Sequence, residues 1–288
     1  MRHLTAILFF GAAVVAAQAQ RTFDTPEDAA KALIDAAANN DTAALEAIFG
    51  PKCATVLTCG KAEQDKAERD EFARIAQHKY QLERDSMNRD RMILSIGDED
   101  WPFPVPIVKA NGKWSFDTAL GATMMRARRI GANEMDAIEI CAGYASAQSQ
   151  YAEQHGGMQY ALRLLSSSGK DDGLYSDAHA LVPREFAEAA VDGASNTKPK
   201  RYHGYYFKML TAQGPAAPGG QHNYLVKNSL MGGFALVAWP AEYGVTGMHT
   251  FLVNQDGVVY QRDLGRPVNP VAAPLARYNP DPSWKPVN

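Results

Sequence analysis

Residues 119 to 154 place the strongest constraint on the fold, because they form one continuous helical pattern between two stretches of different character. Small and apolar side chains recur at helical spacing along two stripes of this segment. One stripe contains Met135, Ile138, Cys141, Ala142 and Ala145, and the other contains Ile140, Tyr144, Ala147 and Tyr151. Two stripes predict burial on two sides, as expected of a helix between two modules. We expect Gly131 to break or kink this helix.

Helix signals dominate the chain before residue 80. Thr25 to Asp28 (TPED) provide a capping hydroxyl, a proline at the first helical position and two acids that complement the helix dipole. The helix that they begin should run to about Ala38. Asp41 caps a second, short helix that Gly50 ends, and a third helix is expected over about 62–80.

Strand signals follow these helices. We expect strands at 91–96, 104–109 and 114–116, with Asn111-Gly112 as the hairpin turn between the last two. Helices followed by a curved antiparallel sheet resemble the nuclear-transport-factor-two-like fold, in which a helix pair covers a bent sheet around a pocket. The resemblance rests on the order of elements over residues 24–118, and it implies a cone-shaped α+β domain.

The chain after the long helix also mixes helix and strand. One short helix is expected at 184–191, strands at 202–209 and 233–239, and a hairpin over 249–262. A long helix followed by a small antiparallel sheet loosely resembles the soluble part of pilin-like subunits, although the continuous hydrophobic N-terminal helix of pilins is missing. The whole chain is therefore predicted to be an α+β protein.

The N-terminus has the three-part pattern of a secretory signal peptide. A basic start, Met1-Arg2-His3, precedes an apolar run from Leu4 to Ala17, and Ala17-Gln18-Ala19 has the small-x-small pattern of a cleavage site. The apolar run is shorter than the roughly 20 residues of a membrane span, which favours a cleaved signal peptide. An uncleaved N-terminal anchor is the alternative. We expect cleavage after Ala19 and a periplasmic or secreted protein without stable membrane insertion. The residue directly after the predicted cleavage site is Gln20 and not a cysteine, which argues against a lipoprotein anchor.

These patterns divide the chain into four parts. We predict a signal peptide over 1–19, an N-terminal cone-like α+β domain over 24–130, a domain of long helix and antiparallel sheet over 131–265, and a proline-rich tail over 266–288. The net charge of −3 argues against nucleic acid as a partner, because such binding requires clustered Lys and Arg. The densest basic cluster, residues 126–129, is only one helical turn long and is read as a solvated helix face.

Cysteine usage points to one disulfide. Cys53 and Cys59 enclose five residues, and an oxidising compartment would allow a bridge between them if their chain forms a tight loop. Cys141 lies on an apolar helix stripe and is read as a buried small hydrophobe. A metal site at Cys53 and Cys59 lacks a second ligand pair, so none is predicted.

Catalytic signals are weak. No histidine has a metal-ligand spacing, although His203, His222 and His249 could converge with Asp256 or Asp263. Residues 167–170 match the S-x-x-K pattern of penicillin-recognising enzymes but occur in a Gly/Ser turn without a later K-T-G. We predict no catalytic, cofactor or metal site.

Aromatic side chains gather in the second half of the chain. On a sheet they could stack on a sugar or bury a partner, although ordinary sheet packing also explains them. The candidate ligand or partner surface consists of Tyr202, Tyr205, Tyr206, Trp239, Tyr243 and Tyr260.

Five strings carry a family resemblance: EMDAIEICAGYASAQSQYA, GKDDGLY, GYYFKML, MGGFALVAWPAEYGVTGM and TFLVNQDGVVYQRDLG. They resemble bacterial exported proteins grouped as domain of unknown function 2950. The resemblance implies an envelope protein without assigned activity or catalytic residues. Cys53 and Cys59 do not belong to this pattern, so their bridge would be particular to this chain.

The leading hypothesis is an exported, soluble, non-catalytic binding or assembly module of the bacterial envelope, with an unidentified envelope protein or small ligand as its partner. One alternative is an enzyme of the hydrolase or isomerase type that uses a pocket in the N-terminal cone. A deep pocket with His78 or buried carboxylates would favour that enzyme. The other alternative is a pilus-like structural subunit.

Overall fold

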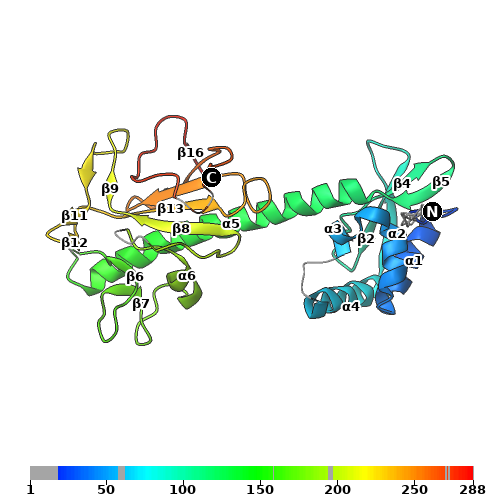
Figure 1. Ribbon diagram of the computed structural model, residues 1–288, viewed down its shortest axis with the longest axis horizontal. Helices are drawn as coiled ribbons and strands as arrows, with labels where there is room; N and C mark the ends of the chain where they lie inside the picture. The colour runs from blue at the N-terminus through cyan, green and yellow to red at the C-terminus, as the bar shows by residue number, and fades with distance from the viewer. Residues whose placement is uncertain are drawn as a thin grey trace, which may run out of the picture. The chain divides into compact units, whose positions relative to one another are not determined.

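The structure is a computed structural model, which describes residues 19–57, 62–157, 159–193, 197–269, 271 and 273–287. The chain divides into two compact units, one up to Met125 and one from Arg126 onward (Figure 1). Both units combine helices with antiparallel sheet, which confirms the predicted α+β class. In the part of the chain that is described, no helix is both long and apolar enough to span a membrane.

The helices of the first unit begin where their capping residues predict. The structure has α1 at Pro26–Ala38 and α2 at Thr42–Phe49, followed by the short helices η1 (Gly50–Lys52) and α3 (Ala54–Leu57) and by α4 (Ala62–His78). The short helices η1 and α3 were not predicted. The Thr25 hydroxyl accepts a hydrogen bond from the amide of Asp28 at 3.1 Å, and Asp41 accepts one from the amide of Ala44 at 2.9 Å. Each cap satisfies an amide that the first helical turn leaves unpaired.

The sheet of the first unit is antiparallel throughout. Its strands are β1 (Tyr80–Arg84), β2 (Arg91–Ile96), β3 (Trp101–Pro102), β4 (Ile107–Ala110) and β5 (Lys113–Phe116), in the order β1-β2-β4-β5 with β3 beside β2. The turn at Asn111-Gly112 is confirmed, since both residues have positive φ, 51° and 79°. The prediction missed β1. Tyr80 begins this strand, whereas the helix was predicted to continue to about residue 80 and no strand was predicted after it.

The long helix α5 (Thr118–Gln154) is confirmed, but the predicted break at Gly131 is wrong. A helical glycine costs only about 1 kcal/mol relative to alanine, which is too little to interrupt a helix of this length. The apolar stripes also begin later than predicted. Met135 is 64% exposed, whereas Ala137, Cys141 and Tyr144 are buried in the core of the second unit.

The second unit is built on a five-stranded antiparallel sheet. Its order is β16-β15-β14-β13-β8, and the strands are β8 (Tyr205–Leu210), β13 (Ala235–Pro240), β14 (Thr250–Asn254), β15 (Tyr260–Arg262) and β16 (Lys285–Pro286). Shorter elements surround it: α6 (Arg184–Ala189), the parallel pair β6 (Arg163–Leu165) and β7 (Gly173–Tyr175), and the pairs β9 (Ala212–Gln213) with β10 (His222–Asn223) and β11 (Leu225–Val226) with β12 (Ser229–Leu230). The proline-rich tail contributes to the core, because Tyr278 and Trp284 are buried.

Asp192 gives the second unit a pH dependence. Burial raises the pKa of this carboxyl, against the lowering effects of the Leu164 amide, which donates to Oδ1 at 2.8 Å, and of Arg163. A raised pKa in the folded state means that the stabilising contribution is complete below the unfolded value of 3.8 and is lost as the pH rises through the folded value. We therefore expect Asp192→Asn, which keeps the acceptor and removes the charge, to raise the unfolding free energy at pH 7.

The advantage of Asp192→Asn should vanish as the pH falls below about 4, where the aspartate is also neutral. Asp192→Ala is the control, because it removes the charge together with the acceptor of the Leu164 amide and should therefore be about 1–3 kcal/mol less stable than Asp192→Asn at every pH. Urea denaturation of both variants between pH 3 and pH 8 measures the difference. A constant difference between Asp192→Asn and wild type would contradict the assigned protonation.

Candidate functional site

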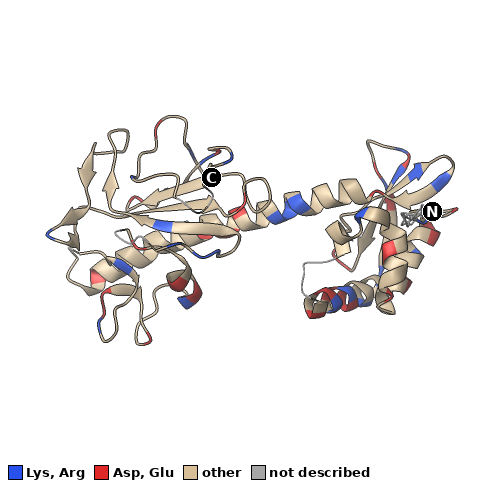
Figure 2. Ribbon diagram, in the orientation of Figure 1, with Lys and Arg blue, Asp and Glu red and all other residues tan. Residues whose placement is uncertain are grey.

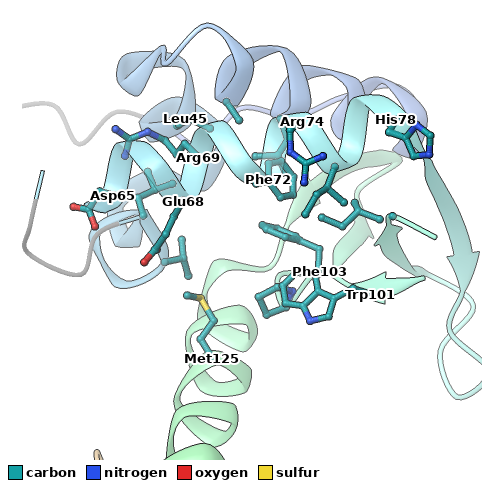
Figure 3. A pocket seen from close by; sticks show the side chains of 18 of the residues that line it. Leu45, Asp65, Glu68, Arg69, Phe72, Arg74, His78, Trp101, Phe103 and Met125 are labelled. Carbon is teal, nitrogen blue, oxygen red and sulfur yellow. The ribbon is translucent and has the colours of Figure 1, made fainter. Parts of the chain in front are cut away.

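The first unit contains a cavity of about 760 Å³ (Figure 3). Its walls come from α1 and α2, from α3, from the inner side of α4, from the chain between the end of β2 and residue 104, and from the start of α5. The lining residues are mainly aliphatic and aromatic, and they include Leu33, Leu45, Phe49, Val56, Leu57, Phe72, Ile75, Ile96, Trp101, Phe103 and Met125. All of the described lining residues belong to the first unit.

The sequence of α4 produces one graded wall of this cavity. Residues spaced three and four apart on a helix share a face, and Asp65, Glu68, Phe72 and Ile75 have that spacing. Along this face the side chains change from acidic at the start of the helix to apolar further along. Basic and imidazole side chains of α4 also line the cavity, and Figure 3 labels them: Arg69, Arg74 and His78. Residues of both charge signs occur along α4 (Figure 2), as expected of a helix with one solvated face.

Aromatic rings form the interior of the site. The ring centroids of Phe72 and Phe103 are 5.2 Å apart, and Phe103 also lies 6.5 Å from Phe49 and 6.4 Å from Phe116. Trp101 is 47% exposed and lines the cavity beside Phe103. The rings provide a large apolar surface with exposed aromatic faces, which suits an apolar ligand.

A glycine turn brings the chain after β2 up to α4. Gly97 has φ +74°, and a Cβ at this position would lie 2.9 Å from Cγ2 of Ile75. A larger residue would be strained in its backbone and would push against the cavity wall. This turn places Asp98 and Glu99 among the lining residues.

The charged side chains of the site are partly engaged. The Arg74 guanidinium donates to both carboxylate oxygens of Glu71, at 2.8 and 2.6 Å, and this pairing raises the pKa of Arg74 and lowers that of Glu71. Arg69 donates through Nε to Asn40 at 2.8 Å. His78 Nε2 lies 3.5 Å from Asp98, with its side chain 69% exposed.

The predicted aromatic surface of the second unit is not one continuous patch. Tyr205 and Trp239 are buried in the sheet, while Tyr206 is half-buried with its ring 5.7 Å from that of Trp239. Tyr260 is half-buried on β15. The rings of Tyr202, Tyr205, Tyr206, Trp239, Tyr243 and Tyr260 thus divide between core and surface.

Tyr202 and Tyr243 have other surroundings. Tyr202 lines a cavity of about 270 Å³ with Phe186 and His203, and its ring centroid is 4.4 Å from that of His203. The Tyr243 hydroxyl donates to Asp263 at 3.0 Å, which raises the pKa of Tyr243. Neither side chain lies in the cavity of the first unit.

His203, His222 and His249, which could have converged, have separate surroundings in the structure. His203 Nδ1 lies 2.6 Å from Asp136 and His249 Nδ1 lies 3.1 Å from Glu134, whereas His222 lies beside backbone carbonyls. Over the described part of the chain, no group of three or more His, Cys, Asp and Glu has the geometry of a metal site. The partners of His203 and His249, Asp136 and Glu134, lie on α5, and no pattern in the sequence pairs them with these histidines.

Asn133, Glu134 and Asp136 on α5 form a polar clamp that was not predicted from the sequence. Glu134 Oε1 accepts hydrogen bonds from the amides of residues 248 and 249 at 2.8 and 3.0 Å, and Asn133 donates to the carbonyl of Thr246 at 2.9 Å. The clamp fixes the loop before β14 to the helix. Its one signal was a polar cluster directly before the buried stripe of α5.

The other candidates have structural explanations. Burial would raise the pKa of Asp172, but hydrogen bonds from the amide and hydroxyl of Ser167 hold this pKa below its usual value. Ser167 therefore has a structural role, because its hydrogen bonds to Asp172 close a turn. Burial raises the pKa of the Cys141 thiol, as expected of an inert core cysteine. Cys53 is half-buried, and Cys59 lies outside the described residues, so their bridge stays a prediction.

The fold and the site define a two-unit α+β protein whose N-terminal unit encloses an apolar cavity with charged walls. The chain belongs to the family described as "Protein of unknown function (DUF2950)", which it matches over residues 20–287. This match confirms the resemblance seen in the sequence. No curated protein and no solved structure matches the chain.

Proposed function

We propose that this protein is an exported binding module whose N-terminal unit holds a small apolar molecule. The cavity carries this proposal. Its volume of about 760 Å³ lies within the roughly 300–1,000 Å³ of typical small-molecule sites, and its lining is predominantly apolar and aromatic. The described residues that line the cavity include no Ser, Thr, Cys or Lys, which are common nucleophiles. The described lining therefore suits binding of an apolar molecule better than nucleophilic catalysis.

Export is part of the proposal and rests on the N-terminal sequence. The family match begins at residue 20, directly after the predicted cleavage site. The carboxamide of Gln20 donates to the carbonyls of Ile48 and Phe116 at 2.9 and 2.6 Å, so the first residue of the mature chain has a place in the fold. These observations support a mature protein that starts at Gln20 and functions in the periplasm or outside the cell.

The finer fold resemblances belong to the same proposal. In the first unit, residues of the helices and of an antiparallel sheet line a pocket, which supports a nuclear-transport-factor-two-like cone. In the second unit, a long helix packs against an antiparallel sheet, which supports the looser pilin-like comparison and an assembly role. A pilus-like subunit would polymerise, whereas the binding module should be recovered as a monodisperse species.

The binding test uses mature protein from the envelope fraction, with its N-terminus sequenced and expected to begin at Gln20. The probe is N-phenyl-1-naphthylamine, a neutral apolar dye that fluoresces in apolar sites. Val56→Trp places a large ring in the cavity and should weaken dye binding about tenfold or more, because the dye loses the space it occupies. Thr55→Trp is the matched control, since Thr55 is the exposed neighbour on α3 and does not line the cavity.

Equal loss of binding in both variants, or no dye binding by wild type, would overturn the binding proposal.

The second candidate, an enzyme in the same cavity, is favoured by the buried carboxylate of Asp65 and by His78 in the wall. Mass spectrometry of the ligand that co-purifies with the protein separates the two. A ligand that is recovered unchanged after prolonged incubation supports binding, and one converted by wild type but not by His78→Gln supports the enzyme.

A further inference from the structure

A smaller cavity lies in the second unit and shares no residue with the cavity of the proposed function. We propose that it is a second ligand site, in which His203 accepts a hydrogen bond from the head of a small apolar molecule. The ligand class is therefore an apolar ring or short chain that carries an N–H or O–H donor. This site goes beyond the proposed function and does not depend on it.

Three segments of the second unit form this cavity. One face of α5 contributes residues spaced three and four apart, which lie on the same side of a helix: Asp136, Glu139, Ile140, Gly143 and Tyr144. The chain at the start of α6 contributes Leu181, Val182, Pro183 and Phe186, and the turn before β8 contributes Tyr202 and His203. The buried members of this set are Tyr144, Val182 and Phe186, so the inner part of the wall is largely apolar.

The volume of the cavity, about 270 Å³, limits the ligand to a small molecule. An apolar cavity of about 150 Å³ is large enough to bind benzene. The cavity of the second unit can therefore hold one ring with a short chain, and it is smaller than the roughly 300–1,000 Å³ of drug-sized sites. Gly143 leaves part of this space open, because a Cβ at this position would meet nothing within 4 Å.

His203 and Asp136 form an oriented pair within the lining. Nδ1 of His203 lies 2.6 Å from Oδ2 of Asp136, and both side chains remain partly exposed. An ionised carboxylate only accepts hydrogen bonds, so Nδ1 carries the proton of the neutral imidazole and Nε2 keeps its lone pair. Among the described residues Nε2 has no hydrogen-bond partner, which leaves this nitrogen for a ligand.

His203 occupies a turn position whose backbone does not by itself favour histidine. The turn joins Tyr202 to Tyr205, which exchange two backbone hydrogen bonds of 2.9 Å. Its two central residues, His203 and Gly204, have φ values of 46° and 77°. Turns with two positive φ values favour Asn-Gly, the pair that this chain has at 111–112. The imidazole is therefore explained better by the contacts of its side chain than by the turn.

Contacts to α5 and to the chain after β13 hold this turn in place. A Cβ at Gly204 would lie 2.4 Å from Nδ2 of Asn133, so the turn packs directly on the helix, one helical turn before Asp136. The amide of Ala241 donates to the carbonyl of Gly204 at 3.0 Å. The acceptor nitrogen is thus presented on a fixed backbone and does not have to be ordered when a ligand binds.

The polar groups of the lining indicate the chemistry of the ligand head. They are the imidazole of His203, the carboxylates of Asp136 and Glu139 and the hydroxyls of Tyr144 and Tyr202, and the described lining residues include no Lys, Arg, Ser, Thr, Asn or Gln. The carboxylates and Nε2 accept hydrogen bonds, so a head that donates is satisfied in this cavity. A carboxylate head would instead face like charges.

The test uses the mature protein with isotope-labelled isoleucine methyl groups, because isoleucines report on the two cavities separately. Ile140 lines the cavity of the second unit, whereas Ile75 and Ile96 line that of the first. The probes share one aromatic ring and a two-carbon chain: 2-phenylethylamine, 2-phenylethanol and phenylacetate. In NMR titrations we expect the amine and the alcohol to shift the Ile140 methyl signal, and phenylacetate to bind about tenfold more weakly than the better of them. Tighter binding of the amine assigns a cationic head to the ligand, and tighter binding of the alcohol assigns a neutral one.

Two variants locate the binding in this cavity. Gly143→Leu fills its space from the wall and should weaken binding about tenfold or more. Gly131→Leu is the matched control on the same helix, since a Cβ there also meets nothing within 4 Å and the residue does not line the cavity. His203→Asn keeps a residue suited to the turn but removes Nε2, and it should weaken binding of the amine and of the alcohol about fivefold.

Phenylacetate that binds as tightly as the other two probes, or no shift of Ile140 with any probe, would overturn the inference. Undiminished binding in Gly143→Leu or in His203→Asn would also contradict it. An equal loss in Gly131→Leu would do the same, because the effect would then come from the helix. Shifts of Ile75 and Ile96 report on the first unit, so failure at one cavity is distinguishable from failure at the other.

Discussion

Gln148→Leu is expected to lower the unfolding free energy of the second unit by about 3 kcal/mol. Gln148 is fully buried, and its carboxamide donates to the carbonyl of Ala161 at 3.0 Å and to the Tyr144 hydroxyl at 3.1 Å, while Oε1 accepts from the amide of Ala161 at 2.8 Å. Leucine fills a similar volume but offers no polar atom. Both backbone groups of Ala161 would therefore be left unsatisfied in the core, each at a cost of about 1–3 kcal/mol.

The measurement must resolve the two units, because a chain with two compact units need not unfold in one transition. Hydrogen exchange followed by mass spectrometry reports the unfolding free energy of peptides around Ala161. Gln150→Leu is the control on the same helix, since Gln150 is exposed and its carboxamide reaches only Ser146, at 3.1 Å. A change below about 0.5 kcal/mol in Gln148→Leu would show that another group satisfies Ala161.

Gly247→Ala is expected to destabilise the second unit by about 3 kcal/mol, the upper end of the usual range for overpacking a core. A Cβ at position 247 would lie 2.0 Å from the hydroxyl oxygen of Tyr205 and 2.5 Å from Cζ. The ring of Tyr205 cannot easily move, because it is fully buried and its hydroxyl donates to the carbonyl of His249 at 3.0 Å. The methyl group would displace the ring and break this hydrogen bond.

Gly131→Ala provides the opposite expectation in the same protein. Nothing lies within 4 Å of a Cβ at this exposed helical position, so alanine should stabilise α5 by about 1 kcal/mol. Tyr205→Leu should partly rescue Gly247→Ala by removing the clashing atoms. Thermal denaturation of Gly131→Ala, Gly247→Ala, Tyr205→Leu and the double variant Gly247→Ala/Tyr205→Leu measures both effects. A rescue that fails, with Gly247→Ala still destabilised, would place the strain somewhere other than at Tyr205.

The sequence predicted the elements whose signals are local. The caps Thr25 and Asp41 mark two helix starts because a side-chain oxygen and an amide three residues later are neighbours in any helix. Asn111-Gly112 predicted its turn because few residue pairs tolerate two positive φ values. The boundary between α4 and β1 at Tyr80 was misplaced, because no capping or breaking residue marks it in the sequence.

The candidate site was only partly predictable. The resemblance in the order of elements implied a pocket in the N-terminal unit, and the cavity lies there. His78 was named only as a residue that would favour an enzyme if a deep pocket contained it, and it is one of the lining residues. The aromatic surface proposed for the second unit instead divides between core and surface. Alternation along β8 explains this difference, since Tyr205 faces the core and Tyr206 faces away from it, and no pattern in one strand tells which face is covered.

The sequence by itself determined the longer helices, the hairpins at 111–112 and 249–262, the family and the expectation of export, because these depend on residues that are close together along the chain or on whole strings of them. Only the tertiary structure decided the cavity and the clamp. Leu33, Phe72 and Phe103 meet around one space, and Glu134 meets the amides before β14, across separations of 30 to more than 100 residues. Such contacts depend on how elements pack, and packing is a property of the folded chain that local propensity does not encode.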